Sequence, residues 1–300
     1  MVYSPRRDIG DLTWRTVNVV YYYYDKDNSS TNIVATLDPS LSEVTGVTEE
    51  QHTGRLGTAT STVDSGYTFW TAATQQTNPV YEADSRWTVP YAHEPYNTAC
   101  SYTHCDYTPW AGLTTDYNGA NYIVQAGTDS GVYCAFGGCS EFYQSVYEFK
   151  PQPVQYCGGV RSGDHVEADV YNDAILGGSS GNWDVYLFDY GTSGPPGGQT
   201  LCAVSGYGFG VPTPYYAQFI GERACKCQGF TRLPNFGSVT MTTGINTRNG
   251  GITGYTPYSN GWDYQIFMNN GCSDGTDNIS TSNVATDGTF TLTYENSCNT

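Results

Sequence analysis

Apolar and polar residues alternate along much of this chain, and the alternation predicts β-strands. Helical periodicity of 3.6 residues is almost absent, whereas a period of two recurs in short segments. Clusters of Gly, Asn, Asp and Pro separate these segments and predict turns. The predicted strands are 17–24, 121–127, 145–151, 165–172, 182–190, 216–223, 238–243, 263–269 and 289–295.

Many short strands with turns between them are typical of an all-β sandwich or barrel. The chain has 300 residues, a length that one large β-sandwich can fill. Alternation assigns the side chains of each strand to two faces. Several strands then carry one apolar face and one face of amide, carboxylate and aromatic groups. We therefore predict an antiparallel sandwich of the lectin-like jelly-roll type, with a concave face that binds an extended polymer.

The candidate chemistry lies on the polar faces of three predicted strands. Gln125 lies on the face opposite Val124 and Ala126, which we assign to the core. The three groups that share a face are Asn121, Ile123 and Gln125; Val146, Glu148 and Lys150; and Gln218, Ile220 and Glu222.

Residues 1–65 differ from the rest of the chain. They hold five basic and nine acidic residues, against seven and twenty in the remainder. The stretch 36–65 is polar and has no aromatic residue. We predict two parts, an N-terminal extension over 1–65 that is an extra strand, a linker or a pro-segment, and a sandwich domain over 66–300.

The chain is strongly acidic, and this excludes some partners. It has 12 Lys and Arg against 29 Asp and Glu, a net charge of −17. Nucleic acids and anionic membrane surfaces are bound mainly through Lys and Arg, so we expect neither as a partner. No run of about 18 apolar residues predicts a membrane span. The surface repels itself least when its carboxylates are protonated, which suits an acidic medium.

Ten cysteines, an even number, favour disulfides and an extracellular protein. The short spacings of Cys100 with Cys105 and Cys134 with Cys139 predict local loop staples. They do not match the usual C-x₂-C pairs of zinc sites, so we expect no metal. Two sequons, at Asn28 and Asn278, are compatible with N-glycans outside the cell.

A series of short motifs resembles the glutamic peptidases, also called eqolisins. SRWTVP (85–90), together with Trp70, is similar to the family's opening Trp strand and V-P turn. WAGLT (110–114) resembles W-x-G-I-D, and IVQAG (123–127) resembles I-L-Q-T-G. YEFKP (147–151) resembles Y-E-W-Y-P. GDHV (163–166) resembles G-D-x-I, and AQFIGE (217–222) resembles A-E-F-I-I-E.

The resemblance covers about residues 66–300, in order and with similar gaps. It implies a secreted acid endopeptidase built from two seven-stranded antiparallel sheets, with polypeptide substrates and no cofactor. It also implies that Gln125 and Glu222 are the catalytic residues. Trp110, Glu148, Asp116 and Trp70 are the substrate-binding candidates.

This chain departs from the family pattern at three positions. Thr114 replaces the acid of W-x-G-I-D, and Asp116 is a stand-in two residues later. Val146 replaces the tryptophan two residues before the site glutamate. Gln218 replaces the first glutamate of A-E-F-I-I-E. The Gln125 and Glu222 pair itself is intact.

A glutamine and a glutamate have the chemistry that amide hydrolysis needs. An ordinary Glu titrates near about 4.3, so in acid it can take a proton from water and return it to the leaving amine. A carboxamide offers both a donor and an acceptor, which can orient the water and stabilise the oxyanion.

Two other functions fit the same residues. Glu148 and Glu222 on one concave face could form a glycoside hydrolase, which needs two carboxyls at a set separation. A lectin-like or adhesive sandwich without catalysis would also be rich in Tyr and Asn. For Glu222 the structural alternative is a strand-end carboxylate paired with Arg223 or Lys226.

Overall fold

The computed structural model describes seventeen ranges of the chain, and all the regular structure in them is β. The ranges are 19–24, 30–37, 57–61, 64–70, 80–95, 104–117, 120–135, 138–172, 182–195, 197–208, 216–223, 225–226, 229–230, 232–247, 262–268, 278–285 and 287–295. This confirms the predicted all-β class. Asn28, Cys100 and the segment 36–65, apart from its described strands, lie outside these residues. Within these ranges there is no helix that could cross a membrane.

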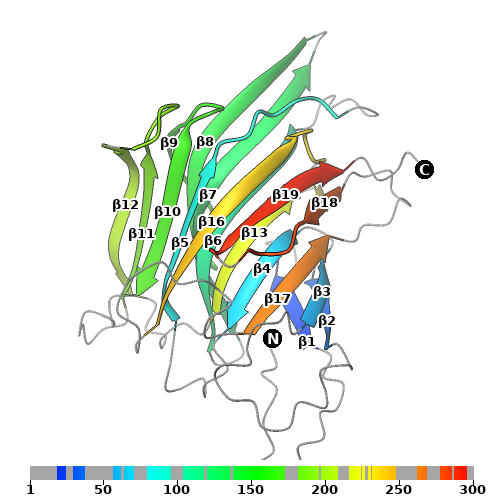
Figure 1. The fold of residues 1–300 in the computed structure, drawn as a ribbon, viewed down its shortest axis with the longest axis vertical. Helices are drawn as coiled ribbons and strands as arrows, with labels where there is room; N and C mark the ends of the chain where they lie inside the picture. The colour runs from blue at the N-terminus through cyan, green and yellow to red at the C-terminus, as the bar shows by residue number, and fades with distance from the viewer. Residues whose placement is uncertain are drawn as a thin grey trace, which may run out of the picture.

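Two large sheets form the sandwich (Figure 1). Sheet A has ten strands in the order β1 (Val19–Tyr24), β2 (Ser30–Leu37), β3 (Gly57–Ser61), β17 (Trp262–Met268), β4 (Asp64–Trp70), β13 (Tyr216–Arg223), β6 (His104–Tyr117), β7 (Ala120–Ala135), β8 (Gly138–Lys150) and β9 (Gln155–Gly159). Sheet B has seven, in the order β12 (Gln199–Gly208), β11 (Asn182–Asp189), β10 (His165–Asn172), β5 (Val80–Thr88), β16 (Ser238–Thr247), β19 (Thr289–Glu295) and β18 (Asn278–Thr281). A small pair joins β14 (Cys225–Lys226) to β15 (Gly229–Phe230).

The N-terminal strands extend one side of sheet A. β2 pairs with β1 and β3, and β3 runs parallel to β17. Every other described pairing of the two large sheets is antiparallel, which agrees with the predicted antiparallel sandwich. Without β1–β3, seven strands remain in sheet A, which is the number that the resemblance implied for each sheet.

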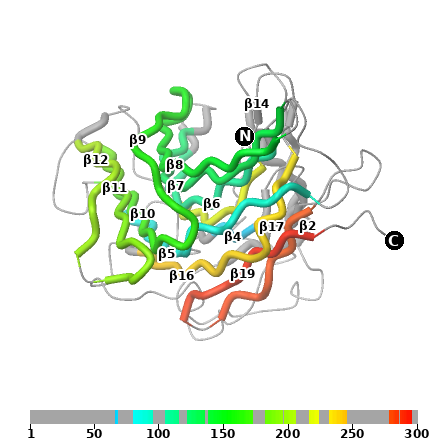
Figure 2. Tube along the Cα trace, turned by 90° about the horizontal axis from the view of Figure 1, so that it is seen from above, coloured from blue at the N-terminus to red at the C-terminus, as the bar shows by residue number. Residues whose placement is uncertain are grey.

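The core lies between the two sheets, which form separate layers when the molecule is seen from above (Figure 2). The alternation read from the sequence decides which side chains enter it. In β10 every second residue is buried, and the same holds in β19. Sheet A contributes Val124 and Phe219, as predicted for the apolar side of their strands, together with Leu113 of β6, and sheet B contributes Trp87 and Trp183.

A buried hydrogen bond crosses the core and ties the two sheets together. The Trp87 indole of β5 donates to the Thr128 hydroxyl of β7 over 3.0 Å. A buried indole N–H needs a partner, so this contact fixes where β7 sits against sheet B. β7 also carries Gln125, and the SRWTVP motif therefore supports the strand that presents the amide.

The Gly163–Asp164 motif forms a turn rather than a site. Gly163 has a φ of +88°, in the region that favours glycine. The carboxylate of Asp164 accepts from the backbone N–H of Arg161 over 2.7 Å, and the Asp164 carbonyl accepts from Val89 over 2.8 Å. The turn places the start of β10 beside the end of β5.

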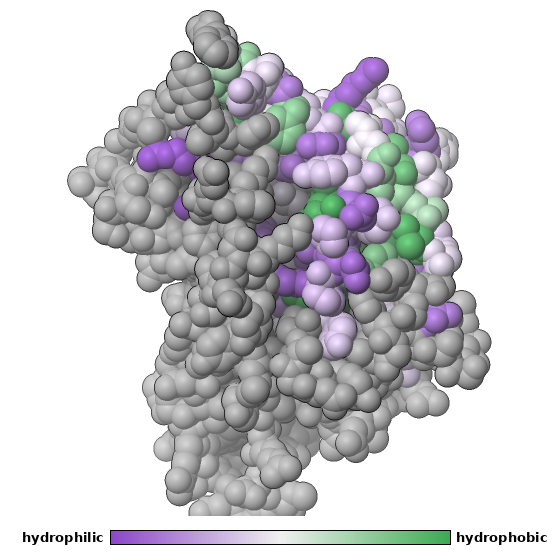
Figure 3. Space-filling model, turned by 180° about the vertical axis from the view of Figure 1, so that it is seen from behind, coloured by the Kyte–Doolittle hydropathy of each residue, from purple (hydrophilic) through white to green (hydrophobic). Residues whose placement is uncertain are grey.

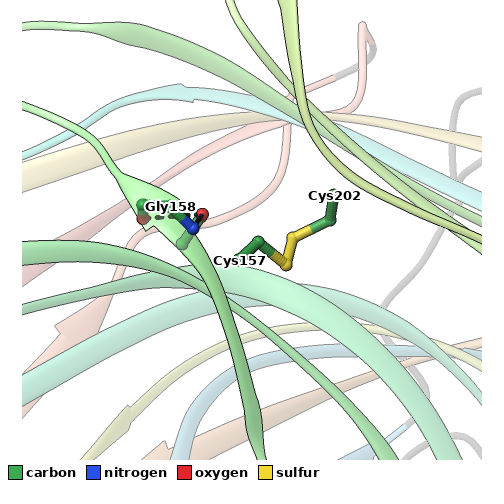
Figure 4. The surroundings of a disulfide bond; sticks show 4 residues. Cys157, Gly158 and Cys202 are labelled. Atoms are coloured by element: carbon green, nitrogen blue, oxygen red, sulfur yellow. Dashed lines mark hydrogen bonds between the residues drawn. A yellow bond between two sulfur atoms is a disulfide. The ribbon is translucent and has the colours of Figure 1, made fainter.

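Disulfides join cysteines close in sequence and cysteines far apart. Cys134 bonds to Cys139 at the tip of the β7–β8 hairpin, as the spacing predicted. Cys157 of β9 bonds to Cys202 of β12, and so links the end strand of sheet A to the end strand of sheet B (Figure 4). Beside it, the Ser145 hydroxyl bonds both the N–H and the carbonyl of Gly158 over 2.9 Å.

Loss of the Cys157–Cys202 bond is expected to destabilise the protein more than loss of Cys134–Cys139. The two bonds span 45 and 5 residues, and a longer closed loop restricts the unfolded chain more. The chain-entropy relation gives about 4 kcal/mol for the first and about 2 kcal/mol for the second. Urea unfolding of the Cys157→Ala/Cys202→Ala and Cys134→Ala/Cys139→Ala variants measures both. The reverse order would contradict this account.

Candidate active site

Gln125 lies at the centre of a row of residues that crosses sheet A. In β7 it faces Gly112 of β6 on one side and Glu148 of β8 on the other. Its side-chain amide donates to the Glu148 carboxylate over 3.0 Å, and both side chains are partly exposed. A carboxylate only accepts, so this contact turns the Gln125 nitrogen toward β8.

Glu222 lies on the same face, two strands away and four residues further along. It faces Thr108 of β6, and it is partly exposed. Its carboxylate accepts a hydrogen bond from the Trp110 indole over 2.8 Å. Trp110 lies on β6 between Thr108, which faces Glu222, and Gly112, which faces Gln125. Its contact therefore draws the Glu222 carboxylate along the sheet toward Gln125.

Glycines occupy two positions between Gln125 and Trp110. A Cβ at Gly112 would lie 2.6 Å from the Val124 carbonyl oxygen and 3.0 Å from the Gln125 Cβ. A Cβ at Gly127 would lie 2.3 Å from the Pro109 carbonyl oxygen and 2.8 Å from the Trp110 Cβ. No larger residue fits either position, so the space between Gln125 and Trp110 holds no further side chain from these two strands.

Strand geometry sets the demand on the Gln125 and Glu222 pair. Two strand spacings and four residues of rise place their Cα atoms about 16 Å apart in a flat sheet. The two side chains must lean toward each other to hold one water. The Trp110 contact supplies that lean for Glu222.

Two of the three departures from the family pattern form one physical unit. The Thr114 hydroxyl donates to the Gln218 amide oxygen over 2.6 Å, and the Gln218 nitrogen donates to the Thr68 hydroxyl over 3.2 Å. All three side chains are buried. Where the family pattern has two acids, this chain therefore has a neutral ladder across β6, β13 and β4, whose hydrogen bonds need no proton uptake.

The substrate-binding candidates do not all lie near Glu222. Trp110 is 1% exposed, so it offers almost no surface to a substrate and instead holds Glu222. Asp116 faces Asn121, and Trp70 faces Tyr216 and Trp262, so both lie beyond Gln125 on the side away from Glu222. Their side chains lie outside the described part of the structure. Of these candidates, Glu148 is hydrogen-bonded to Gln125.

The structure adds Asp129 to this face, which the sequence reasoning missed. Asp129 is two positions beyond Gly127 in the alternation of β7, is 5% exposed, and accepts from the Thr108 hydroxyl at 3.5 Å. Thr108 in turn faces Glu222. The alternation of 121–127 would have found Asp129 if the predicted strand had been extended to the end of β7.

Metal ligation has no clear place among the described residues. Glu94, Cys134 and Cys139 have their ligand atoms within 4.8 Å of one another, close enough to share a metal ion. The two cysteines are, however, joined in a disulfide. Disulfide sulfurs do not provide the thiolates that bind zinc.

Seen from behind, the described surface mixes hydrophilic and hydrophobic residues (Figure 3).

Comparison with known proteins identifies a family for this chain. The sequence model of the peptidase A4 family matches residues 68–294. A crystal structure of scytalido-glutamic peptidase with a peptide-based transition-state analogue is similar at 17% identity and a TM-score of 0.51, covering 78% of this chain and 98% of that one. Aspergilloglutamic peptidase from Aspergillus niger is 22% identical, with a TM-score of 0.37, over 63% of this chain and 99% of that one. A search of curated proteins gave no significant match.

Proposed function

The chain belongs to the peptidase A4 family and is a peptidase, and we propose that it is a secreted endopeptidase that works in acid through Gln125 and Glu222. The resemblance of the motifs to glutamic peptidases is confirmed by the family match. Secretion is supported by the disulfides of the described chain, because such bonds persist in oxidising compartments.

One observation carries the catalytic assignment. The Trp110 indole holds the Glu222 carboxylate on the face that presents Gln125, next to positions where only glycine fits. A strand-end carboxylate serving only as a surface charge would not need a buried indole as partner. The contact preorganises the acid, which is the condition for efficient proton transfer.

The proposed reaction moves one proton twice. The Glu222 carboxylate takes a proton from water as the water oxygen bonds to the peptide carbonyl carbon. The carbonyl oxygen becomes an oxyanion. Glu222 then gives that proton to the amide nitrogen, and the C–N bond breaks to release an amine and a carboxylic acid. A Glu performs both steps best when its pKa lies near the working pH, which for an ordinary Glu is acidic.

Beyond its contact with Glu148, the Gln125 amide still has the groups that this reaction requires. One N–H is engaged by Glu148, which leaves a second N–H and the amide oxygen. The oxygen can accept from the attacking water and the N–H can donate to the oxyanion. Glu148 is therefore a positioning residue in this proposal, because it fixes the direction of the amide.

The glycoside hydrolase alternative fits the geometry less well. Glu148 and Glu222 are separated by three strand spacings and four residues, about 20 Å between Cα atoms in a flat sheet. Glycosidases place their two carboxyl groups about 5 to 9.5 Å apart, so the side chains of Glu148 and Glu222 would have to close a separation wider by one strand spacing than that of Gln125 and Glu222. Glu148 is also turned toward Gln125 rather than toward Glu222.

Hydrolysis assays on two substrate classes test the function. The wild-type chain is expected to cleave unfolded casein at about pH 3 to 5 and to lose most activity near neutral pH, because a general acid–base works best when its pKa lies near the working pH. Mass spectrometry of the fragments identifies internal cleavage. Sugar release from a polysaccharide panel without casein cleavage would favour the glycosidase, and glycan binding without either activity would favour the adhesive sandwich.

A further inference from the structure

The outer face of sheet B, on the far side of the sandwich from Gln125, holds two carboxyl groups directly opposite each other. Asp84 of β5 and Asp169 of β10 are cross-strand partners. Cβ atoms of such partners lie about 4.5 to 5.5 Å apart, and like charges there destabilise a sheet. Both side chains are mostly buried, and within the described part of the chain one oxygen of each, Oδ1, is buried with no hydrogen-bond partner. The Asp84 carboxyl also interacts with the Glu167 side chain through a hydrogen bond.

The surroundings of this pair are strongly acidic. Asp169 of β10 faces Tyr186 of β11. Asp84 of β5 faces Gly244 of β16, which has no side chain to cover it. The titratable groups that face the pair are Glu82 and Arg86 on β5, Glu167 and Tyr171 on β10, and Asp184 and Tyr186 on β11. The facing residues of β16, which do not titrate, are Thr242, Gly244 and Asn246.

The single cation among these groups is already engaged. Arg86 forms an ion pair with Glu167 over 2.9 Å, and its side chain is 60% exposed. The Tyr190 hydroxyl donates to the other oxygen of Glu167 over 2.6 Å. Arg86 lowers the pKa of Asp84, but less than burial and Glu167 raise it, and no cation is among the groups that shift the pKa of Asp169.

Burial is the main reason why this pair holds protons. It raises the pKa of Asp84 to about 7, with a further rise from Glu167 that outweighs the lowering by Arg86. It raises the pKa of Asp169 to about 8, with further rises from Glu82 and Asp84. Unfolded Asp residues titrate near about 3.9. Two groups that hold protons far more tightly in the folded chain link its stability to pH.

We propose that Asp84 and Asp169 form a proton-dependent contact between β5 and β10, which keeps sheet B intact while a carboxyl is protonated and loosens it when both ionise. A protonated carboxyl can donate to its partner, whereas two carboxylates repel each other across a buried strand pair. The device does not involve Gln125 or Glu222. It restricts the folded protein to acidic and near-neutral media, whatever the catalytic residues are.

The direction of the effect follows from proton uptake. Between about pH 4 and pH 8 the folded chain binds more protons at these two sites than the unfolded chain, so stability falls as pH rises. The contribution is complete below the unfolded pKa and is lost as pH passes through about 7 and about 8. Asn is the neutral mimic of a protonated Asp, so an Asn pair would retain the contact at all these pH values.

Thermal unfolding of the full chain tests this, in a Glu222→Gln background that prevents self-digestion. The unfolding temperature is expected to fall by about 10 °C between about pH 5 and pH 8.5. In Asp84→Asn/Asp169→Asn the fall should shrink to less than half. The matched control, Glu94→Gln/Glu295→Gln, removes two exposed carboxylates and should fall as the parent does. An equal fall in the Asn variant, or a flat parent, would overturn the proposal.

Carboxyl titration followed by ¹³C NMR gives a second readout, which does not depend on how well the Asn variant folds. We expect an Asp carboxyl that titrates above about pH 6. Its signal should disappear in the single variant that replaces that residue, Asp84→Asn or Asp169→Asn. If every Asp carboxyl titrates below about pH 5.5, the pair does not hold protons and the proposal fails. Casein cleavage is not part of either readout, so failure of the proposed catalysis leaves this test intact.

Discussion

Glu222→Gln is expected to lower the rate of casein cleavage by about 10³-fold or more, with the folded structure preserved. The carboxamide cannot take a proton from water or return one to the amine. Its oxygen can still accept from the Trp110 indole, so the contact that positions residue 222 is retained. The partial exposure of Glu222 also means that the change leaves no cavity in the core.

Initial rates at several casein concentrations, together with near-ultraviolet circular dichroism, separate lost chemistry from lost folding. Loss of an interaction made only in the transition state lowers kcat and kcat/KM equally. Glu295→Gln, which changes an exposed carboxylate in sheet B, is the matched control and should keep full activity. A Glu222→Gln enzyme within tenfold of wild type would remove Glu222 from the mechanism.

Gln125→Ala is expected to lower kcat by about 10² to 10³-fold and to change KM little. The substitution removes the donor for the oxyanion and the acceptor for the attacking water. It also removes one donor from the Glu148 carboxylate, which is partly exposed and can be hydrated in place of the lost amide. The stability cost should therefore remain near 1 kcal/mol.

The control for Gln125→Ala makes the same deletion elsewhere in sheet A. Gln155 lies on β9, is exposed, and donates to the nearby Pro153 carbonyl, so Gln155→Ala should leave kcat unchanged. A rise in KM with kcat intact would instead show that Gln125 binds substrate without assisting the chemistry. Activity equal to that of wild type would leave Glu222 without its proposed partner.

Clean alternation alone did not decide which strands the sequence predicted, because β5 alternates in burial and was missed, whereas β13 does not and was predicted. β10 and β19 follow the period of two from end to end, and both were predicted within one residue. β6 was missed because Pro109 and Gly112 interrupt its pattern. Pro109 is tolerated in a central strand because the described β6–β7 register passes from Tyr107 to Trp110, where no ladder bond from Pro109 is required.

Some features of the site could be predicted from the residues of one strand alone. The face shared by Gln218, Ile220 and Glu222 follows from alternation alone, and so does the core side of Val124 and Ala126. The motifs predicted the family, which the family match confirms. The role of Asn278 as a glycan acceptor and the removal of residues 1–65 stay predictions.

The sequence by itself determined the all-β class, the faces of most strands and the family, because local alternation and short motifs are properties of neighbouring residues. Only the tertiary structure decided which residues meet. The contacts of Trp110 with Glu222, Thr114 with Gln218 and Asp84 with Asp169 join residues 85 to 112 positions apart. Strand order and register create those contacts, and both depend on long-range pairing that no local pattern encodes.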